Sequence, residues 1–247
     1  MIDSHCHLDD PRFSKGLDDA LLHARQAGVE HFIIPGVQHR QWSTQLSIAE
    51  KYQNISNAFA IHPWYCEQHN NAHLLQLEAL LPHAIAVGEC GLDFMPNRPA
   101  HDIQLRCFQK QLELAQKFNL PLIIHSVKSA DQVATQLRHY PQLCGVIHGF
   151  SGSLQQAETF VKLGFYIGIG TRLLQQQQGQ RANTLLCELP LESILLETDA
   201  PDGLGKHQCN EPANLIDVAQ ALANTKNIPL EFVQKQCTSN TKELFSL

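Results

Sequence analysis

The sequence predicts an α/β protein whose strands and helices alternate around a closed (β/α)8 barrel, the TIM barrel. Eight short apolar segments rich in β-branched residues recur along the 247 residues, with helical patterns between them. Segments that are apolar on both faces are typical of buried parallel strands. Strands alternating with helices indicate βα units, and about 250 residues suffice for eight of them in one barrel. A doubly wound open sheet is the alternative arrangement.

Each predicted strand is too short for a helix and is apolar on both faces. These strands are Met1–His7, His31–Val37, Asn57–His62, Ala84–Glu89, Leu120–His125, Cys144–Phe150, Phe165–Gly170 and Ser193–Asp199. Apolar residues at helical spacing predict the helices Phe13–Ala27, Asp102–Phe118, Leu154–Leu163, Ala213–Ala223 and Leu230–Phe245. The polar run Gln175–Gln178 is interpreted as a solvated loop or a helix start. Because composition does not change along the chain, we expect one barrel domain over residues 1–247.

Composition and charge exclude several classes of protein. Hydrophobic residues make up 43% of the chain, which excludes disorder. The sequence has no run of the roughly 20 apolar residues that a membrane-spanning helix needs, so no membrane partner is expected. With 18 Lys and Arg against 24 Asp and Glu, the net charge is −6. A general basic surface for nucleic acid is therefore excluded, and any phosphate must be held by local side chains or by bound metal.

The eight cysteines are scattered and lack the paired spacing of zinc modules or redox motifs. The N-terminal residues show no basic segment followed by an apolar one, so no signal peptide is predicted. We expect reduced thiols in a cytoplasmic protein, and no obligate protein partner is indicated.

Residues that can bind metal recur where predicted strands end, which in a barrel is the active-site face. His5 and His7 end the first strand, and strand periodicity places both imidazoles on one face, able to share one ion. The other strand-end candidates are Glu89 on the fourth strand, His125 on the fifth, His148 on the sixth and Asp199 on the eighth. Clustered imidazoles and buried carboxylates cost free energy unless they are paired or metallated. The joint pattern therefore favours a metal site.

Six ligands exceed what one tetrahedral ion with an open position needs, and they suit two ions that share a bridge. Glu89 is the natural bridge, because a carboxylate offers one oxygen to each ion. Two divalent ions about 3.5–4 Å apart would activate a bridging water and clamp a phosphoryl or carbonyl oxygen. Asp199 could steer the water proton as a general base, so Glu89 and Asp199 are the predicted catalytic residues. The ligand types leave Zn²⁺, Mn²⁺, Co²⁺ and Mg²⁺ open.

The segments that carry these residues resemble the TatD family of metal-dependent deoxyribonucleases, nearest its YjjV branch. They are HCHLD (5–9), IHPW (61–64), GECGLD (88–93), IHS (124–126), HGFSG (148–152), ETDAP (197–201), NEP (210–212) and TSNT (238–241). The resemblance implies a TIM barrel of the amidohydrolase-like metal-dependent hydrolase type and 3′→5′ exonuclease action on DNA. It also implies that His5, His7, Glu89 and Asp199 bind one ion, and that Glu89, His125 and His148 bind the other.

Further residues are expected around the ions. His62 resembles the family's substrate-side histidine, and Asp93 could orient a ligand or a bound water. Where the family has an arginine followed by an acid after the fifth-strand His-Ser, this chain has Val127 and Lys128, so Lys128 is the remaining cationic candidate for a phosphate. Two other departures are Asp202 in place of an aromatic residue and Cys209 in place of a basic one.

These departures weaken binding of a polyanion more than they affect a metal-activated water, so three functions stay open. The first is a TatD-type phosphodiesterase that acts as a DNA exonuclease. The second is an amidohydrolase-like enzyme for a small ester, amide or phosphoester. The third is a non-catalytic barrel that binds metal for stability.

Overall fold

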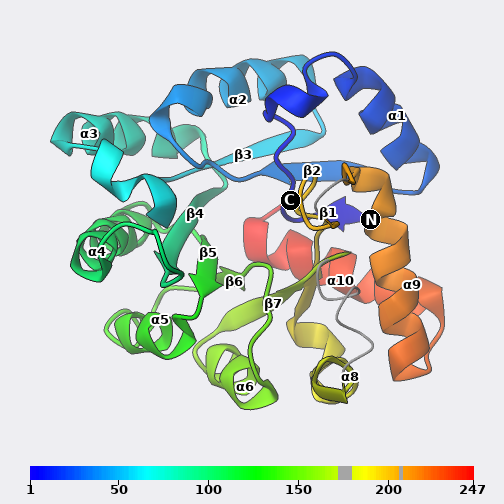
Figure 1. The fold of residues 1–247 in the computed structure, drawn as a ribbon. Helices are drawn as coiled ribbons and strands as arrows, with labels where there is room; N and C mark the ends of the chain where they lie inside the picture. The colour runs from blue at the N-terminus through cyan, green and yellow to red at the C-terminus, as the bar shows by residue number, and fades with distance from the viewer. Residues whose placement is uncertain (172–179, 206–207) are drawn as a thin grey trace.

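The computed structural model describes residues 1–171, 180–205 and 208–247, and its strands form the predicted barrel (Figure 1). The eight strands pair in parallel in sequence order, from β1 to β8. They are β1 (Ile2–Asp3), β2 (His31–Ile34), β3 (Ile55–Phe59), β4 (Ala86–Asp93), β5 (Leu122–Val127), β6 (Gly145–Ile147), β7 (Phe165–Ile169) and β8 (Ile194–Leu196). The ring closes where the Ser4 amide donates to the Leu196 carbonyl at 3.1 Å.

Helices surround the strands in the order of the chain (Figure 1). The α-helices are α1 (Leu17–Gln26), α2 (His39–Lys51), α3 (Asn71–Leu80), α4 (His101–Phe118), α5 (Ala130–Leu137), α6 (Leu154–Lys162), α8 (Gln180–Glu188), α9 (Leu215–Lys226) and α10 (Leu230–Phe245). Short 3-10 turns are η1 (Pro11–Phe13), η2 (Pro63–Gln68), η3 (Leu81–His83), η4 (Leu191–Ser193) and η5 (Pro212–Asn214). The predicted helices are present with shifted ends, and Gln175–Gln178 lies outside the described residues.

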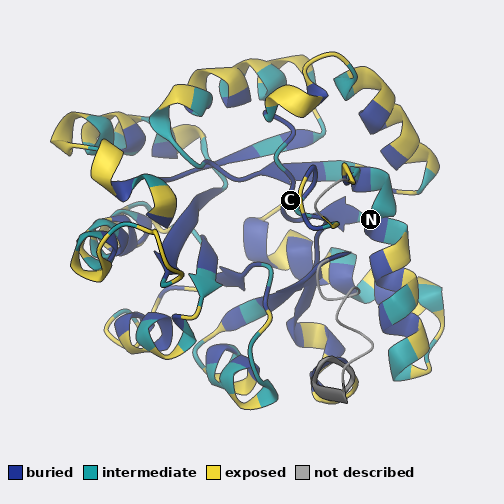
Figure 2. Cartoon of the chain, in the orientation of Figure 1, coloured by how far each residue is buried: buried dark blue, intermediate teal, exposed yellow. Residues whose placement is uncertain are grey.

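The core has two parts. Between the strands and the helices lies a large apolar layer, and Figure 2 shows the strands buried while the helices alternate buried and exposed faces. A smaller cluster joins apolar side chains of six strands to Leu244 and Phe245 of α10. This helix crosses behind the ring of strands in Figure 1 and closes that end of the barrel. The opposite end, where the strands finish, is left for the site.

Several strand ends differ from the prediction, and the differences matter for the site. β1 stops at Asp3 because the carboxylate of Asp3 then accepts the amides of His5 and Thr198, at 3.3 and 3.0 Å, in place of ladder bonds. His5 and His7 therefore lie beyond the strand. β4 continues to Asp93, so Glu89 lies inside the strand and does not end it. His125 is likewise inside β5, which extends to Val127.

Two other expectations concern the whole chain. All eight cysteines are free thiols, as the sequence predicts. Among the described residues, no helix combines the length and the apolar character that crossing a membrane requires.

Candidate metal centre

The six predicted ligands come together at the carboxyl ends of the strands, with the Glu89 carboxylate between two groups of imidazoles. One oxygen, Oε2, lies 3.3 Å from Nε2 of His5 and 3.7 Å from Nε2 of His7. The other, Oε1, lies 2.8 Å from Nδ1 of His125 and 2.9 Å from Nε2 of His148. The two oxygens of one carboxylate thus face different imidazole pairs.

The local backbone of β4 explains how Glu89 reaches this position. Gly88 pairs with Ile123 and Cys90 pairs with Ile124, so Glu89 is an extra residue at a register shift. Such a bulge re-aims a side chain. The Glu89 carboxylate therefore points to the centre of the ring from within a strand.

Asp199 joins the His5 and His7 side of the cluster. Its Oδ1 lies 3.5 Å from Nε2 of His7 and 3.7 Å from Nε2 of His5. The backbone of Asp199 is left-handed, with φ of 59°, a conformation that aspartate tolerates better than most residues. The Asp199 amide also donates to the His5 carbonyl at 2.9 Å, which ties this turn to the segment after β1.

His62 contacts the same carboxylate rather than the outer part of the cavity. Its Nε2 lies 3.4 Å from Glu89 Oε1, and its Nδ1 accepts the Trp64 amide at 3.1 Å. Accepting this amide at Nδ1 leaves the proton on Nε2, which then donates to Glu89. Burial lowers the pKa of His62 to about 4, so its ring is neutral near pH 7. His62 is thus a fifth imidazole around Glu89.

The carboxylates and imidazoles of the cluster shift one another's pKa values. Burial alone would raise the pKa of Glu89, but the surrounding histidines, His148 first among them, hold it well below its ordinary value. Burial opposes protonation of His148, yet the charges of Glu89 and Glu197 raise its pKa well above the ordinary value. A proton on His148 therefore supplies positive charge between the buried carboxylates of Glu89 and Glu197.

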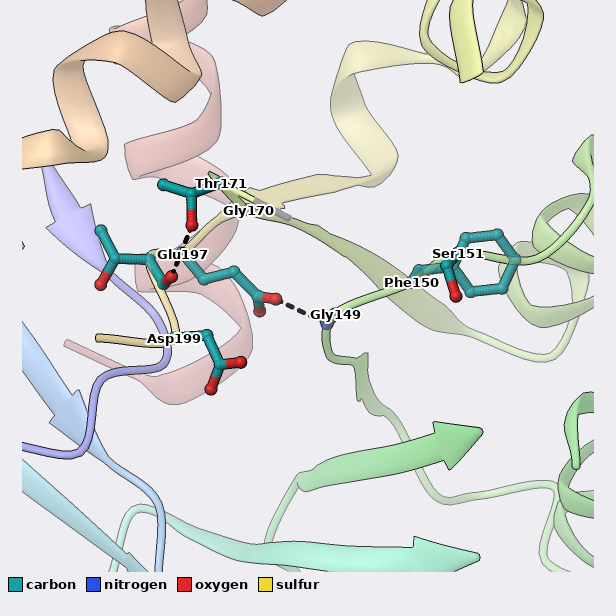
Figure 3. Close-up of a pocket in the computed structure, with 8 residues that line it drawn as sticks. Gly149, Phe150, Ser151, Gly170, Thr171, Glu197 and Asp199 are labelled. Atoms are coloured by element: carbon teal, nitrogen blue, oxygen red, sulfur yellow. Dashed lines mark hydrogen bonds between the residues drawn. The ribbon is translucent and has the colours of Figure 1, made fainter. Parts of the chain in front are cut away.

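Glu197, which the sequence analysis did not select, contacts the ring nitrogen of His148 that does not contact Glu89. The Glu197 Oε1 lies 3.4 Å from Nδ1 of His148 and accepts the Gly149 amide at 2.6 Å. Figure 3 shows this carboxylate reaching Gly149, with Thr171 and Asp199 nearby. A carboxylate on the second nitrogen of a metal-binding histidine fixes its tautomer and increases its basicity. Glu197 follows an apolar strand directly, which is the signal that could have identified it.

Asp93, which was expected to orient a ligand or a bound water, lies beside His125 and also contacts Trp64 and Arg98. Its Oδ2 is 3.4 Å from Nε2 of His125 and accepts the Trp64 indole N–H at 2.5 Å. The Arg98 Nε donates to the same oxygen at 3.3 Å. The guanidinium of Arg98 also lies 3.8 Å from the centre of the Trp64 ring, a cation–π contact. Arg98 had no recognisable motif around it.

A cavity of about 680 Å³ opens over the cluster. Its lining includes His7, His62, Glu89, His125, His148 and Asp199, together with Trp64, Asp93, Arg98, Val127 and Asp202. Lys128, predicted to contact substrate, instead lines a neighbouring cavity of about 510 Å³ with residues of α5 and the loop after β6. Lys128 follows the last residue of β5 and has a left-handed backbone, with φ of 53°, so the alternation of the strand ends before it.

The negative charge at Asp202 is partly offset in the fold, because Asp202 and Asp10 share one guanidinium. Arg12 donates to both oxygens of Asp202, each at 3.0 Å, and to both oxygens of Asp10, at 2.9 and 3.0 Å. Arg12 is 190 residues from Asp202 in sequence, so no local pattern could have revealed the pair. Cys209 is exposed.

The donor set fits divalent metal ions. Among the described residues, the ion-pair partners of Glu89 are all histidines: His5, His7, His62, His125 and His148. Within this cluster, the ligand atoms converge in three groups of three residues. They are His5, His7 and Asp199; His5, His148 and Glu197; and His62, Glu89 and His125. Imidazole nitrogen and carboxylate oxygen are the common ligands of Zn²⁺ and related ions. The barrel and this cluster together define a metal-dependent hydrolase.

Comparison with known proteins gives the family. The model of the TatD related DNase family matches residues 2–246, and the chain belongs to that family. The uncharacterized metal-dependent hydrolase YjjV of Escherichia coli is 38% identical over 256 residues, covering 100% of this chain and 98% of that protein. The crystal structure of that homologue superposes with a TM-score of 0.95 at 37% identity, over 100% of this chain and 98% of the other.

A second relative bears a more specific name. The 3′-5′ ssDNA/RNA exonuclease TatD of Escherichia coli is 30% identical over 259 residues, covering 100% of this chain and 99% of that protein. The predicted family and barrel class are therefore confirmed, and so is the prediction of a metal-dependent hydrolase.

Proposed function

We propose that Glu89 bridges two divalent metal ions, one on each side of its carboxylate. His5, His7 and Asp199 complete the first site with Glu89 Oε2. His125 and His148 complete the second site with Glu89 Oε1. The observation that carries this proposal is the division of the imidazoles between the two oxygens, at 3.3 and 3.7 Å on one side and 2.8 and 2.9 Å on the other.

Divalent ions held there would activate a water at neutral pH and neutralise the charge of a phosphodiester. The residues of the chain have separate roles. Asp199 lines the cavity and accepts the proton of the attacking water at its carboxylate. Asp93 and Glu197 orient His125 and His148, and His62 restrains the Glu89 oxygen that it contacts. The nitrogen-rich donor set suits Zn²⁺, Mn²⁺ or Co²⁺ better than Mg²⁺, which prefers oxygen.

The substrate that we propose is single-stranded DNA, shortened from its 3′ end. The family and the exonuclease relative support this assignment, and the cavity supports it independently. A space of about 680 Å³ accommodates one terminal nucleotide over Glu89. Trp64 is 41% exposed as a residue and lines the cavity, where its aromatic ring can contribute to stacking with a base. Arg98 beside it offers a guanidinium to a phosphate.

A small phosphoester is the second candidate, and Val127 favours it. This apolar side chain lines the cavity where the resemblance leads one to expect an arginine, and Lys128 does not replace it there. A polyanionic strand gains less from such a lining than a compact ester does. Arg98, which lines the same cavity, favours DNA.

An exonuclease assay tests the proposal. A single-stranded oligonucleotide labelled at its 5′ end is incubated with metal-stripped protein reloaded with Mg²⁺, Mn²⁺, Co²⁺ or Zn²⁺. We expect stepwise shortening by the wild type and none by Glu89→Gln, which also controls for contaminating nuclease. If no ion supports shortening, the DNA assignment is wrong, and hydrolysis of small phosphoesters by wild type alone would establish the second candidate.

A further inference from the structure

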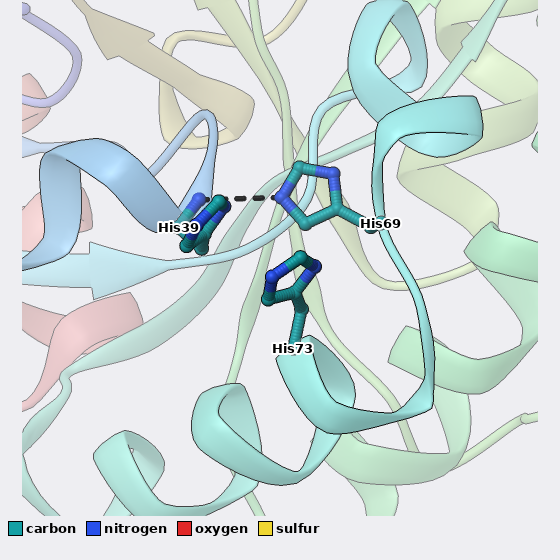
Figure 4. A group of neighbouring side chains, drawn as sticks. All are labelled: His39, His69 and His73. Atoms are coloured by element: carbon teal, nitrogen blue, oxygen red, sulfur yellow. Dashed lines mark hydrogen bonds between the residues drawn. The ribbon is translucent and has the colours of Figure 1, made fainter.

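A second group of histidines lies outside the Glu89 cluster, on three different elements. His39 is the first residue of α2, His69 follows η2, and His73 is in the first turn of α3. Figure 4 shows the three rings facing one another between these helices. We propose that His39, His69 and His73 form an additional binding site for a transition-metal ion, separate from the centre around Glu89.

The geometry supports convergence on one ion. Each ring offers a nitrogen, and these three nitrogens lie within 4.8 Å of one another. The ring centres of His39 and His69 are 5.4 Å apart, and those of His69 and His73 are 5.1 Å apart. Nitrogens around a tetrahedral ion at bond lengths of about 2.0–2.1 Å are roughly 3.3 Å apart. Small rotations of the half-buried side chains close the difference.

His69 is already oriented as a ligand. Its Nδ1 lies 2.7 Å from the Tyr65 carbonyl, so Nδ1 carries the proton and the lone pair is on Nε2. Metal-binding histidines commonly donate their second N–H to a backbone carbonyl in this way. Nε2 accepts the His39 amide at 3.2 Å. That amide belongs to the first turn of α2, where water can replace the acceptor.

The other two rings are weakly held. His39 and His73 stack at 3.9 Å with planes 19° apart, and turning each ring about its Cβ–Cγ bond directs its nitrogens at a shared ion. The Nδ1 of His73 accepts the Asn70 amide at only 3.4 Å. Releasing this contact preserves the cap of α3, because the Asn70 side chain still accepts the amides of Ala72 and His73, at 2.9 and 3.2 Å.

The chemistry of the group selects the class of ion. Burial and mutual repulsion, together with Arg40, lower the pKa of His39 and His69, so both are in the neutral form that binds metal. Three imidazoles without a carboxylate suit Zn²⁺, Ni²⁺ or Cu²⁺ and exclude the oxygen-seeking Mg²⁺ and Ca²⁺. The N-termini of α2 and α3 and the charge of Arg40 oppose a cation, so we expect micromolar affinity.

The position of the group gives the bound ion a role. The connection after β2 ends at His39, and the connection after β3 runs through η2 to His69 and His73. Val37 from the first connection, Gln41 from the first turn of α2, and Tyr65 from the second connection line the cavity over Glu89. One ion bound to all three histidines would therefore join two loops that form this side of the cavity.

Counting bound zinc tests the inference. Metal-free wild type, His69→Ala and His83→Ala are dialysed against micromolar free Zn²⁺, and zinc per chain is measured by mass spectrometry. His83 is exposed on η3 and serves as the matched control. We expect His69→Ala to hold one ion fewer than both other proteins, with unchanged circular dichroism. His39→Ala, which alters a different element, should lose the same ion.

Equal zinc content in wild type, His69→Ala and His39→Ala would overturn the inference. The measurement is independent of the proposed function, because Glu89→Gln should retain the ion that His69→Ala loses. If the Glu89 centre binds no metal, the difference between wild type and His69→Ala remains.

Discussion

Gln104 of α4 hydrogen-bonds with both backbone polar atoms of Asp93. The Asp93 amide donates to Gln104 Oε1 and Gln104 Nε2 donates to the Asp93 carbonyl, each at 2.8 Å. Gln111, two turns further along the helix, does the same for Ile61, at 2.7 and 2.9 Å. Both glutamines are buried. One helix thus fixes the backbone next to His62 and at Asp93.

Replacing Gln104 tests this role. Gln104→Leu keeps the volume but leaves the amide and the carbonyl of Asp93 without partners, and each orphaned group costs about 1–3 kcal/mol. We expect the free energy of unfolding in urea to fall by roughly 2–5 kcal/mol. Gln116→Leu, on the exposed face of α4, is the control and should change stability by less than about 0.5 kcal/mol. Equal effects of both substitutions would contradict the assignment.

Replacing Arg98 and replacing Lys128 should have different effects on the KM for substrate. Arg98 lines the cavity over Glu89, whereas Lys128 lines the neighbouring one. Loss of a charge-assisted contact to a phosphate costs about 1.5–3 kcal/mol, so Arg98→Ala should raise the KM for an oligonucleotide by tenfold or more with a smaller change in kcat. Lys128→Ala should leave the KM within about twofold, since its loss is worth less than ~0.5 kcal/mol. Steady-state kinetics separates the two, and a larger KM effect from Lys128→Ala would reverse the assignment.

The negative charge of Glu197 should matter for metal affinity. Glu197→Gln retains an oxygen for the Gly149 amide but removes the charge beside Nδ1 of His148. Changes to such partners typically cost about 10–100-fold in metal affinity. Competition with a chromogenic chelator measures this directly. An affinity equal to that of wild type would show that Glu197 does not act through His148.

How stability depends on pH can be tested at His31, the first residue of β2. Burial, and then the charge of Lys242, lower the pKa of this histidine, whose Nε2 lies 2.9 Å from the Ser56 hydroxyl. The unfolded chain therefore binds the proton first, and stability is lost as pH falls through about 6.5 toward the folded pKa. In metal-free protein, His31→Gln should show a smaller drop in Tm from about pH 7.5 to about pH 5.5 than wild type. An unchanged drop would contradict this.

Strand ends in the sequence pointed to part of the cluster but not to Glu197, which follows β8 directly. His148 and Asp199 lie just past β6 and β8, so the rule that barrel sites lie at strand ends located them. The same rule placed Glu89 at the end of β4, which was wrong because the strand continues to Asp93 through a register shift. The apolar residues that predict a strand give no sign of a β-bulge, so the register shift at Glu89 could not be predicted from the sequence.

Other parts of the site depend on contacts between distant residues. Arg98 enters the cavity from the loop before α4, and its position follows from Trp64 and Asp93 rather than from its own neighbours. Arg12 pairs with Asp202 across 190 residues of sequence. Val127 lines the cavity over Glu89, whereas Lys128, the predicted substrate contact, lines the neighbouring cavity.

The bridging role of Glu89 is tested most directly by anomalous diffraction from crystals loaded with Mn²⁺. We expect two peaks about 3.5–4 Å apart, one in contact with Oε2 near His5 and the other with Oε1 near His125. A single peak, or two peaks of which one does not contact Glu89, would contradict the account.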